Sequence, residues 1–299
     1  MALRTFARSD AAAVRRLWND VAEYDQLHDQ LLAEKIWDDC DYDPQHQLAA
    51  VRDGQIVGIA SWVARSTEQG QRAYLKFLAV DSRAQRRGIG SQLLDAIEQQ
   101  AWRLGAEESR LAESAPNYLT PGVDSRYAEA IRFFERRGYE RLGTAVNMQA
   151  SLDALPKIDS ETNAFAIRRA SSEDAAPMSR LLAEHWPSWS EEIAVALENE
   201  PPTLFVAYSE GRLLGFAAYD SNNQGTGWFG PMGTDPAVQG QGVGKALLLE
   251  SLHAMRTAGY REAVIPWVGP VNFYRKTIGA QVTREFVRLR KRRPSDWER

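Results

Sequence analysis

Two glycine-rich segments have the residue types and spacing of a phosphate cradle. The first is Gln85-Arg86-Arg87-Gly88-Ile89-Gly90-Ser91, and the second is Gln239-Gly240-Gln241-Gly242-Val243-Gly244-Lys245. Each follows an extended apolar run and precedes a segment with the periodicity of an amphipathic helix. Glycine lets the backbone reach positive φ and approach a ligand closely. Because unpaired N–H groups and the positive dipole end of a helix attract anions, the pattern predicts that phosphate binds at both segments.

The second segment is a copy of the first. Four residue pairs are each separated by the same 154 positions: Asp81 and Asp235, Gln85 and Gln239, Gly88 and Gly242, and Gly90 and Gly244. One shared offset indicates an internal duplication. The length of 299 residues also suits two domains of about 150 residues each. We therefore expect domains at 1–150 and 164–299, joined by a polar, turn-rich linker over 151–163.

A strand, an aspartate and then Gln-x-x-Gly-x-Gly at the start of a helix resembles motif A of the GNAT N-acetyltransferase superfamily. It differs from the Gly-x-Gly-x-x-Gly fingerprint of dinucleotide-binding proteins. The resemblance covers nearly the whole chain twice, so the protein looks like a tandem GNAT. It implies that the loop cradles the pyrophosphate of acetyl-coenzyme A, and that the fourth and fifth strands splay apart to admit this cofactor.

The resemblance also implies which backbone groups hold the pantetheine arm. These are the N–H groups around Met232 and Thr234 in the second half, and around Leu78 and Val80 in the first. The cofactor site implied for the second half also includes Asn272. Arginines in the first loop add charge-assisted contacts to phosphate. We therefore expect both halves to bind coenzyme A.

Acetyl transfer from a thioester to an amine makes three chemical demands. The amine must be neutral, and deprotonating an alkyl ammonium with a pKa of about 10.4 costs roughly 4.6 kcal/mol at pH 7. The developing oxyanion needs positioned N–H donors. The leaving thiolate needs a proton donor, and the resemblance assigns this role to Tyr274. The first half has Phe134 at that place, and phenylalanine cannot donate a proton. Catalysis is therefore expected in the second half, with the first half weakly active or inactive.

The general base and the site of turnover have open alternatives. His185 and Glu184 lie where the family builds its acceptor site, and a histidine with a pKa near 6.5 can act as a base. A water relay would also suffice. Tyr118 or Tyr127 is an alternative proton donor, with catalysis in the first half. A third alternative is a non-catalytic acetyl-coenzyme A sensor or scaffold.

The remainder of the chain alternates between strand and helix patterns in the same order twice. Each half reads β-α-α-β-β-β-α-β-α-β, which favours an α/β fold with a mixed sheet. Strands are expected at 3–7, 47–51, 56–64, 74–80, 109–113 and 139–148, and again at 165–167, 204–208, 213–219, 227–234, 263–267 and 281–290. Helices are expected after Ser9, within 24–44, at 92–103 and 128–137, then after Ser172 and at 246–256 and 272–278, and 114–126 is expected to be a loop.

Composition narrows the classes of partner. Apolar residues make up 44% of the chain and charged residues 25%, with a net charge of −4. This balance argues against nucleic acid as a partner, although the stretch 288–293 is basic. One cysteine, Cys40, excludes an intramolecular disulfide. No signal peptide, membrane span or metal site is predicted. We expect a cytoplasmic monomer or homodimer that acts on a small-molecule amine.

Overall fold

A computed structural model describes residues 1–67, 70–157, 165–295 and 297. The chain forms two compact units. Unit 1 comprises Met1–Ala145 and Glu285–Arg299, and unit 2 comprises Val146–Arg284. Residues 158–163 of the expected linker lie outside the described residues.

Unit 1 is built on a mixed sheet with strand order β1-β2-β3-β4-β5-β13. Its strands are β1 (Ala2–Thr5), β2 (Gln47–Arg52), β3 (Gln55–Thr67), β4 (Gly70–Val80), β5 (Glu108–Leu111), β6 (Val123–Asp124) and the distal part of β13 (Gln281–Arg292). Its helices are α1 (Ala11–Val21), α2 (Asp29–Ile36), α3 (Ile89–Arg103) and α4 (Ala128–Arg136). β7 (Glu140–Ser151) starts in unit 1 and ends in unit 2.

Helices cover both faces of this sheet. α1 and α2 pack with Ile59, Phe77 and Ala79 on one face. α3 and α4 pack with Ala60 and Leu75 on the other. At Gly58 a Cβ would lie 3.0 Å from the side chains of both Ile89 and Leu93 on α3, so the glycine allows the helix to approach the strand closely.

β4 and β5 separate partway along their length. They pair in parallel from Arg72 opposite Glu108 to Leu75 opposite Leu111. β4 continues beside β3 as far as Val80, after a bulge between its pairs at Leu75 and Phe77. The predicted splay of the fourth and fifth strands is therefore present in unit 1.

Unit 2 repeats the plan. A four-stranded sheet has the order β11-β10-β9-β8. Its strands are β8 (Ala166–Arg169), β9 (Leu204–Ser209), β10 (Arg212–Tyr219) and β11 (Phe229–Thr234), and β12 (Glu262–Ile265) meets this group at a single bridge between Val264 and Trp228. The helices are α5 (Ala175–His185), α6 (Ser190–Glu198), α7 (Val243–Thr257) and α8 (Val271–Ile278). The predicted order of elements in each half is confirmed, and the short strand β6 is added within the predicted loop 114–126.

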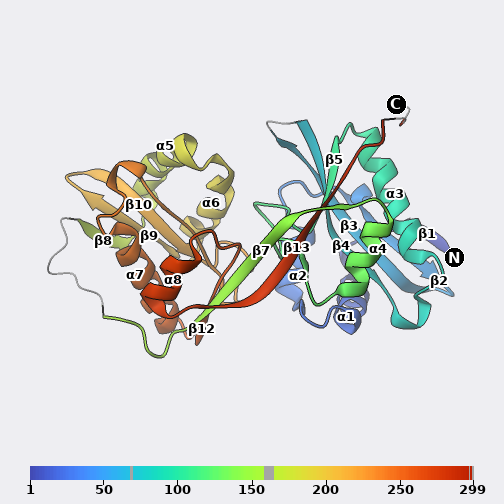
Figure 1. The fold of residues 1–299 in the computed structure, drawn as a ribbon, viewed down its shortest axis with the longest axis horizontal. Helices are drawn as coiled ribbons and strands as arrows, with labels where there is room; N and C mark the ends of the chain where they lie inside the picture. The colour runs from blue at the N-terminus through green and yellow to red at the C-terminus, as the bar shows by residue number, and fades with distance from the viewer. Residues whose placement is uncertain (68–69, 158–164, 296, 298–299) are drawn as a thin grey trace. The chain divides into compact units, whose positions relative to one another are not determined.

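The last strand of each half completes the sheet of the other half. β7 ends in unit 2, where Met148–Ser151 pair antiparallel with β12. β13 ends in unit 1 beside β5 (Figure 1). There Arg290–Arg292 pair with β5, and Phe286 and Val287 pair with β6. The units therefore differ from the predicted ranges 1–150 and 164–299. Duplicated halves end in equivalent strands, so either copy can supply the hydrogen bonds that an open sheet edge requires.

Among the described residues, no helix is both long enough and apolar enough to cross a membrane.

The strand exchange makes unit 1 depend on the end of the chain. Leu289 is fully buried among side chains of unit 1. We predict that Leu289→Ala destabilises unit 1 by about 2–5 kcal/mol, because it leaves a cavity in that core. Hydrogen exchange should show the loss of protection in β5 and not in β12.

Val282 lies in the same strand but is 43% exposed, so Val282→Ala is the matched control and should change stability little. If Leu289→Ala lowered protection only in β12, then β13 would pack with the rest of the second half and would not complete unit 1.

Candidate functional site

A cavity of about 740 Å³ lies within unit 1 at the point where β4 and β5 separate. One part of its wall is the glycine loop with the start of α3 and helix α4. Another part is the end of α1 and the turn after it, including Trp18, Val21 and Asp25. Leu78 and Val80 of β4 line the cavity between these parts. The cavity thus joins the predicted phosphate cradle to the opposite face of the sheet.

The glycine loop of unit 1 leaves room for a ligand at the start of α3. Gly88 is the N-cap residue, with φ +80°, and no side chain caps this helix. A Cβ at Gly88 would meet only the side-chain nitrogen of Gln92, at 3.9 Å. Ile89, Gly90 and Ser91 follow and line the cavity. The backbone N–H groups of this first turn fit a diphosphate group.

Arg86 is held in an unusual backbone conformation beside this turn. Its φ is +60°, whereas its copy in unit 2 is Gly240 with φ +81°. A left-handed conformation costs a residue with a Cβ about 1–2 kcal/mol. The guanidinium forms an ion pair with Glu129 of α4, and both residues line the cavity. Arg87, Gln85 and Arg86 are exposed, so the loop presents its charge at the surface.

Tyr127 lines the cavity from the N-terminus of α4. Its hydroxyl oxygen accepts a hydrogen bond of 2.9 Å from the backbone N–H of Tyr24. The preceding residue, Arg126, lies 3.6 Å above the ring of Tyr24 and donates two side-chain hydrogen bonds to the buried carboxylate of Asp124. Asp124 is itself paired with Phe286 in β13. The exchanged strand therefore helps to fix the segment that carries Tyr127.

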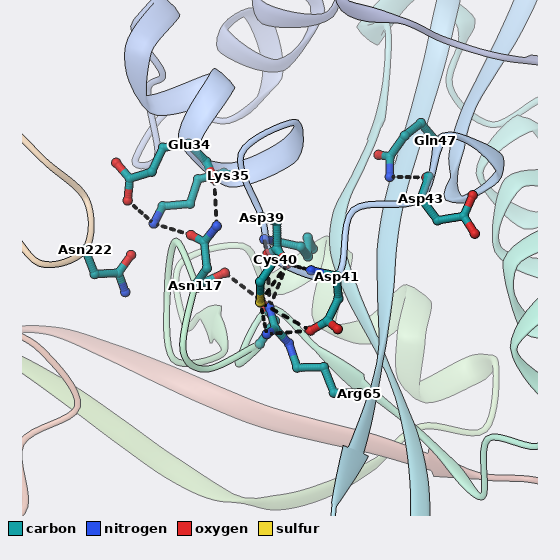
Figure 2. A network of polar contacts seen from close by, with 12 residues as sticks. Glu34, Lys35, Asp39, Cys40, Asp41, Asp43, Gln47, Arg65, Asn117 and Asn222 are labelled. Carbon is teal, nitrogen blue, oxygen red and sulfur yellow. Dashed lines mark hydrogen bonds and ion pairs between the residues drawn. The ribbon is translucent and has the colours of Figure 1, made fainter. Parts of the chain in front are cut away.

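A network of buried charges centres on Asp39, in the loop after α2 (Figure 2). The guanidinium of Arg65 donates to both carboxylate oxygens of Asp39, at 3.1 and 3.0 Å. The ammonium of Lys76 forms a further ion pair with Asp39. Burial acts to raise the pKa of Asp39, but the charges of Lys76 and Arg65 outweigh it and hold the pKa below its ordinary value.

Lys76 is the member of this network that lines the cavity. It is 7% exposed and lies in the bulge of β4. Burial lowers the pKa of Lys76 to about 8, although Asp39 acts in the opposite direction. Lys35, on α2, contributes to the lowering and donates to Glu34 and Asn117, each at 2.7 Å. Lys76 was not among the residues predicted from the sequence. The one signal for it was that a lysine stands inside an otherwise apolar strand.

The glycine loop of unit 2 reproduces that of unit 1. Gly242 is the N-cap of α7 with φ +86°, and again no side chain caps the helix. Gln239, Gln241 and Lys245 are exposed, whereas Val243 is buried. In β11, Met232 and Thr234 pair with Ala217 and Gly215 of β10. Asn272 is exposed on α8 and accepts a hydrogen bond of 3.2 Å from Arg275.

Tyr274 and Phe134 are buried to the same extent, each in the last helix of its half. The backbone N–H of Ala280 bonds to the carbonyl of Tyr274, as that of Tyr139 bonds to the carbonyl of Phe134. Tyr274 is 7% exposed, its ring lies against Phe273 and Phe229, and burial raises its pKa to about 12. Tyr118, the other alternative donor in the first half, is buried.

His185 and Glu184 lie at the C-terminal end of α5. The histidine nitrogen is 3.8 Å from the glutamate oxygen, and its ring lies against Trp186. Trp186 packs with Phe216 on one face of the second sheet, whereas Tyr274 packs with the residues of the other face. The three predicted catalytic residues are thus divided between two faces of that sheet.

The basic stretch at the end of the chain is largely neutralised. Arg288 pairs with Glu113 at 2.6 Å, Arg290 with Glu140 at 2.7 Å and Lys291 with Glu98 at 2.6 Å. These pairs occupy three of the basic side chains that a nucleic-acid surface would need.

The Acetyltransferase (GNAT) family model matches residues 11–139 and 166–280. The chain belongs to this family. A curated relative, mycothiol acetyltransferase of Gordonia bronchialis, is 28% identical over 220 residues, which cover 69% of each protein. The two family matches agree with the two copies of the glycine loop and with the repeated order of elements.

Solved structures of the family share this fold. One is described as a GCN5-related glucosamine N-acetyltransferase region of a fungal multi-domain GH3 beta-N-acetylglucosaminidase, with a TM-score of 0.83 and 16% identity. That alignment covers 97% of this chain and 38% of the other, so this chain spans well under half of that protein. A tandem GNAT protein from the clavulanic acid biosynthesis pathway aligns over 99% of both chains, with a TM-score of 0.69 and 16% identity.

The buried charges around Asp39 should contribute to the stability of the protein. Asp39→Asn should destabilise the protein by about 3–5 kcal/mol, because Arg65 and Lys76 lose a buried counter-charge. The lowered pKa of Asp39 contributes stability above its unfolded pKa of about 3.9, and this contribution is lost as pH falls through the lower folded value. Urea unfolding should therefore show that the difference in free energy of unfolding between variant and parent becomes smaller in acid.

Asp38→Asn provides the control at the neighbouring position. Asp38 is 56% exposed and pairs with Arg8 at the surface, so its loss should cost at most about 1 kcal/mol. Equal destabilisation by the two substitutions would show that the buried network stabilises the protein no more than a surface ion pair does.

Proposed function

We propose that this chain transfers the acetyl group of acetyl-coenzyme A to a primary amine of a small molecule, and that transfer occurs in the cavity of unit 1. The observation that carries this proposal is the cavity itself, which extends from the glycine loop to the end of α1. Family membership supports acetyl transfer, and the mycothiol acetyltransferase relative supports a small-molecule acceptor.

Different parts of unit 1 would bind different parts of acetyl-coenzyme A. The backbone at the start of α3 would hold the diphosphate, with Arg86 exchanging Glu129 for a phosphate oxygen. Beyond Leu75, the edge of β4 that faced β5 is released from the ladder. Its N–H groups around Leu78 and Val80 would hold the pantetheine arm and polarise the thioester carbonyl. Acetyl-coenzyme A supplies an activated acyl group with a thiolate leaving group.

The acceptor would enter beside the end of α1. Trp18 and Val21 offer an apolar wall there, and Asp25 offers a carboxylate to a cationic amine. Holding the amine and the thioester together replaces an encounter in solution by a reaction within one complex, which lowers the barrier by several kcal/mol.

Tyr127 is the proposed proton donor to the departing thiolate. It lines the cavity, and the N–H of Tyr24 points at its oxygen. That N–H would stabilise the negative charge that develops as the proton leaves. The proposal therefore places turnover in the first half, which is one of the alternatives that the sequence left open.

A second candidate keeps turnover in unit 2 with Tyr274 as donor and His185 or Glu184 as base. Its support is the position of Tyr274 in α8 and a pKa near 12, which keeps the phenol protonated at neutral pH. The repeated glycine loop offers that unit a cofactor site of its own.

The two candidates differ in which tyrosine carries the proton. Tyr127→Phe should lower kcat about 10²-fold with little change in the Kd for acetyl-coenzyme A, because only the hydroxyl is removed. Tyr274→Phe should leave kcat nearly unchanged. The measurement is acetyl-dependent thiol release across a panel of amines, with the product identified by mass spectrometry. The reverse pattern would move turnover to unit 2.

Binding can be separated from turnover at the glycine loops. An arginine at residue 90 would extend into the cavity from a position where a Cβ makes only ordinary contacts, at 3.7 and 3.8 Å. Calorimetry should find two molecules of acetyl-coenzyme A per chain in the parent, and one in Gly90→Arg.

Gly244→Arg is the matched change in unit 2, and it should also reduce the stoichiometry to one. Only Gly90→Arg should abolish thiol release. If neither loop of the parent binds acetyl-coenzyme A, the proposed function fails.

A further inference from the structure

We propose that Lys76 is the general base of the unit 1 cavity, the group that accepts the proton of the acceptor amine. This inference rests on the proposed function of that cavity, and it supplies the role for which sequence analysis offered His185, Glu184 or a water relay.

Lys76 lies where β4 separates from β5. Leu75 is the last residue of β4 that pairs with β5, so Lys76 is the first residue beyond the point where the strands separate. It is also the extra residue of a bulge in β4, because its neighbours Leu75 and Phe77 pair with the consecutive residues Trp62 and Ser61 of β3. Bulges redirect a side chain and occur often beside active sites. Two residues further on, Leu78 belongs to the stretch proposed to hold the thioester.

The surroundings of Lys76 favour a neutral amine at this position. The residue is almost fully buried but forms part of the cavity wall. A buried lysine with a pKa of about 8 is partly neutral at physiological pH, with about a tenth of the molecules deprotonated at pH 7. Catalytic bases are tuned toward the working pH in this way by burial and by neighbouring charges.

Three charged side chains act on Lys76 from the elements packed around it. Asp39, after α2, accepts its hydrogen bond and would stabilise the ammonium once a proton has been taken. Arg65 of β3 and Lys35 of α2 oppose the ammonium. Arg65 is also bound to Asp41 at 2.9 Å, and Lys35 to Glu34 at 2.7 Å. Two cations therefore lower the pKa of Lys76, and one fully buried carboxylate raises it.

The proposed step transfers one acetyl group and two protons. The amine nitrogen forms a bond to the acetyl carbon, and the bond between that carbon and sulfur breaks. As the C–N bond forms, the nitrogen becomes acidic and its proton passes to Nζ of Lys76. Tyr127 gives its proton to the thiolate. Lys76 then loses its proton to solvent and Tyr127 regains one, so both residues are restored.

Lys76→Arg provides the sharpest test. Arginine keeps the positive charge and the ion pair with Asp39, but it cannot be deprotonated in a protein. The parent should show kcat rising with pH through a midpoint near 8. Lys76→Arg should lower kcat about 10²–10³-fold and remove that rise, while the Kd for acetyl-coenzyme A stays near the parent value.

Lys35→Gln is the matched control, since Lys35 is also buried, at 0% exposed against 7% for Lys76, but is not among the residues that line the cavity. The charge of Lys35 lowers the pKa of Lys76, so its removal should move the midpoint to higher pH without abolishing the rise. A readout independent of turnover is labelling of the parent with acetic anhydride across pH, followed by mass spectrometry. Lys76 should label with a midpoint near 8.

The outcomes separate the two proposals. Retention of kcat and of the pH rise in Lys76→Arg would overturn the role of Lys76 and leave the proposed function intact. If Lys76→Arg does not fold, Lys76→Met and the labelling midpoint decide, and a midpoint above 10 would overturn the role. A parent that binds acetyl-coenzyme A but releases no thiol with any amine would overturn both.

Discussion

The separation of β4 from β5 is the feature on which the site depends. Up to Leu75 the two strands satisfy each other's backbone groups, and beyond it one edge of β4 faces the cavity. Unpaired N–H groups in a partly enclosed cavity are costly unless something bonds to them. An extended ligand arm that accepts hydrogen bonds can replace the missing strand. The bulge at Lys76 lies at the same point. One irregularity in the sheet is therefore associated with both the open edge of β4 and the proposed base.

The duplication and the strand exchange make the two halves mutually dependent. Leu289 completes the core of unit 1 although it belongs to the second copy, and Met148 is fully buried in the core of unit 2. The segment that carries Tyr127 pairs with β13 through Asp124 and Phe286. The proposed catalytic segment of the first half is therefore held by the last strand of the chain. This arrangement gives the second copy a structural role whether or not it turns over substrate.

Asp39 shows how a buried charge can be retained at a site. Its carboxylate is surrounded by Arg65 and Lys76, and the two cations outweigh the cost of burying it in their effect on its pKa. Replacement of such a network by apolar side chains is often neutral or stabilising. Asp39 is linked to the cavity wall through Lys76, and the role proposed for Lys76 would account for keeping these charges. Within the acidic stretch 38–43, Asp39 pairs with both Arg65 and Lys76, and Asp41 pairs with Arg65.

The sequence by itself determined the fold class, the twofold repeat and the positions of both glycine loops. These features are local, since they depend on glycine spacing, on strand and helix periodicity and on one repeated offset. Only the tertiary structure decided which strand completes which sheet, because β7 and β13 have equivalent patterns and choose partners by long-range pairing. The same holds for the burial of Lys76, and for the cavity that Lys76 and Tyr127 share with distant residues, although the sequence already offered Tyr127 as one of several proton donors. Sequence spacing carries no record of such contacts, so Tyr274 stood out in the sequence and Lys76 did not.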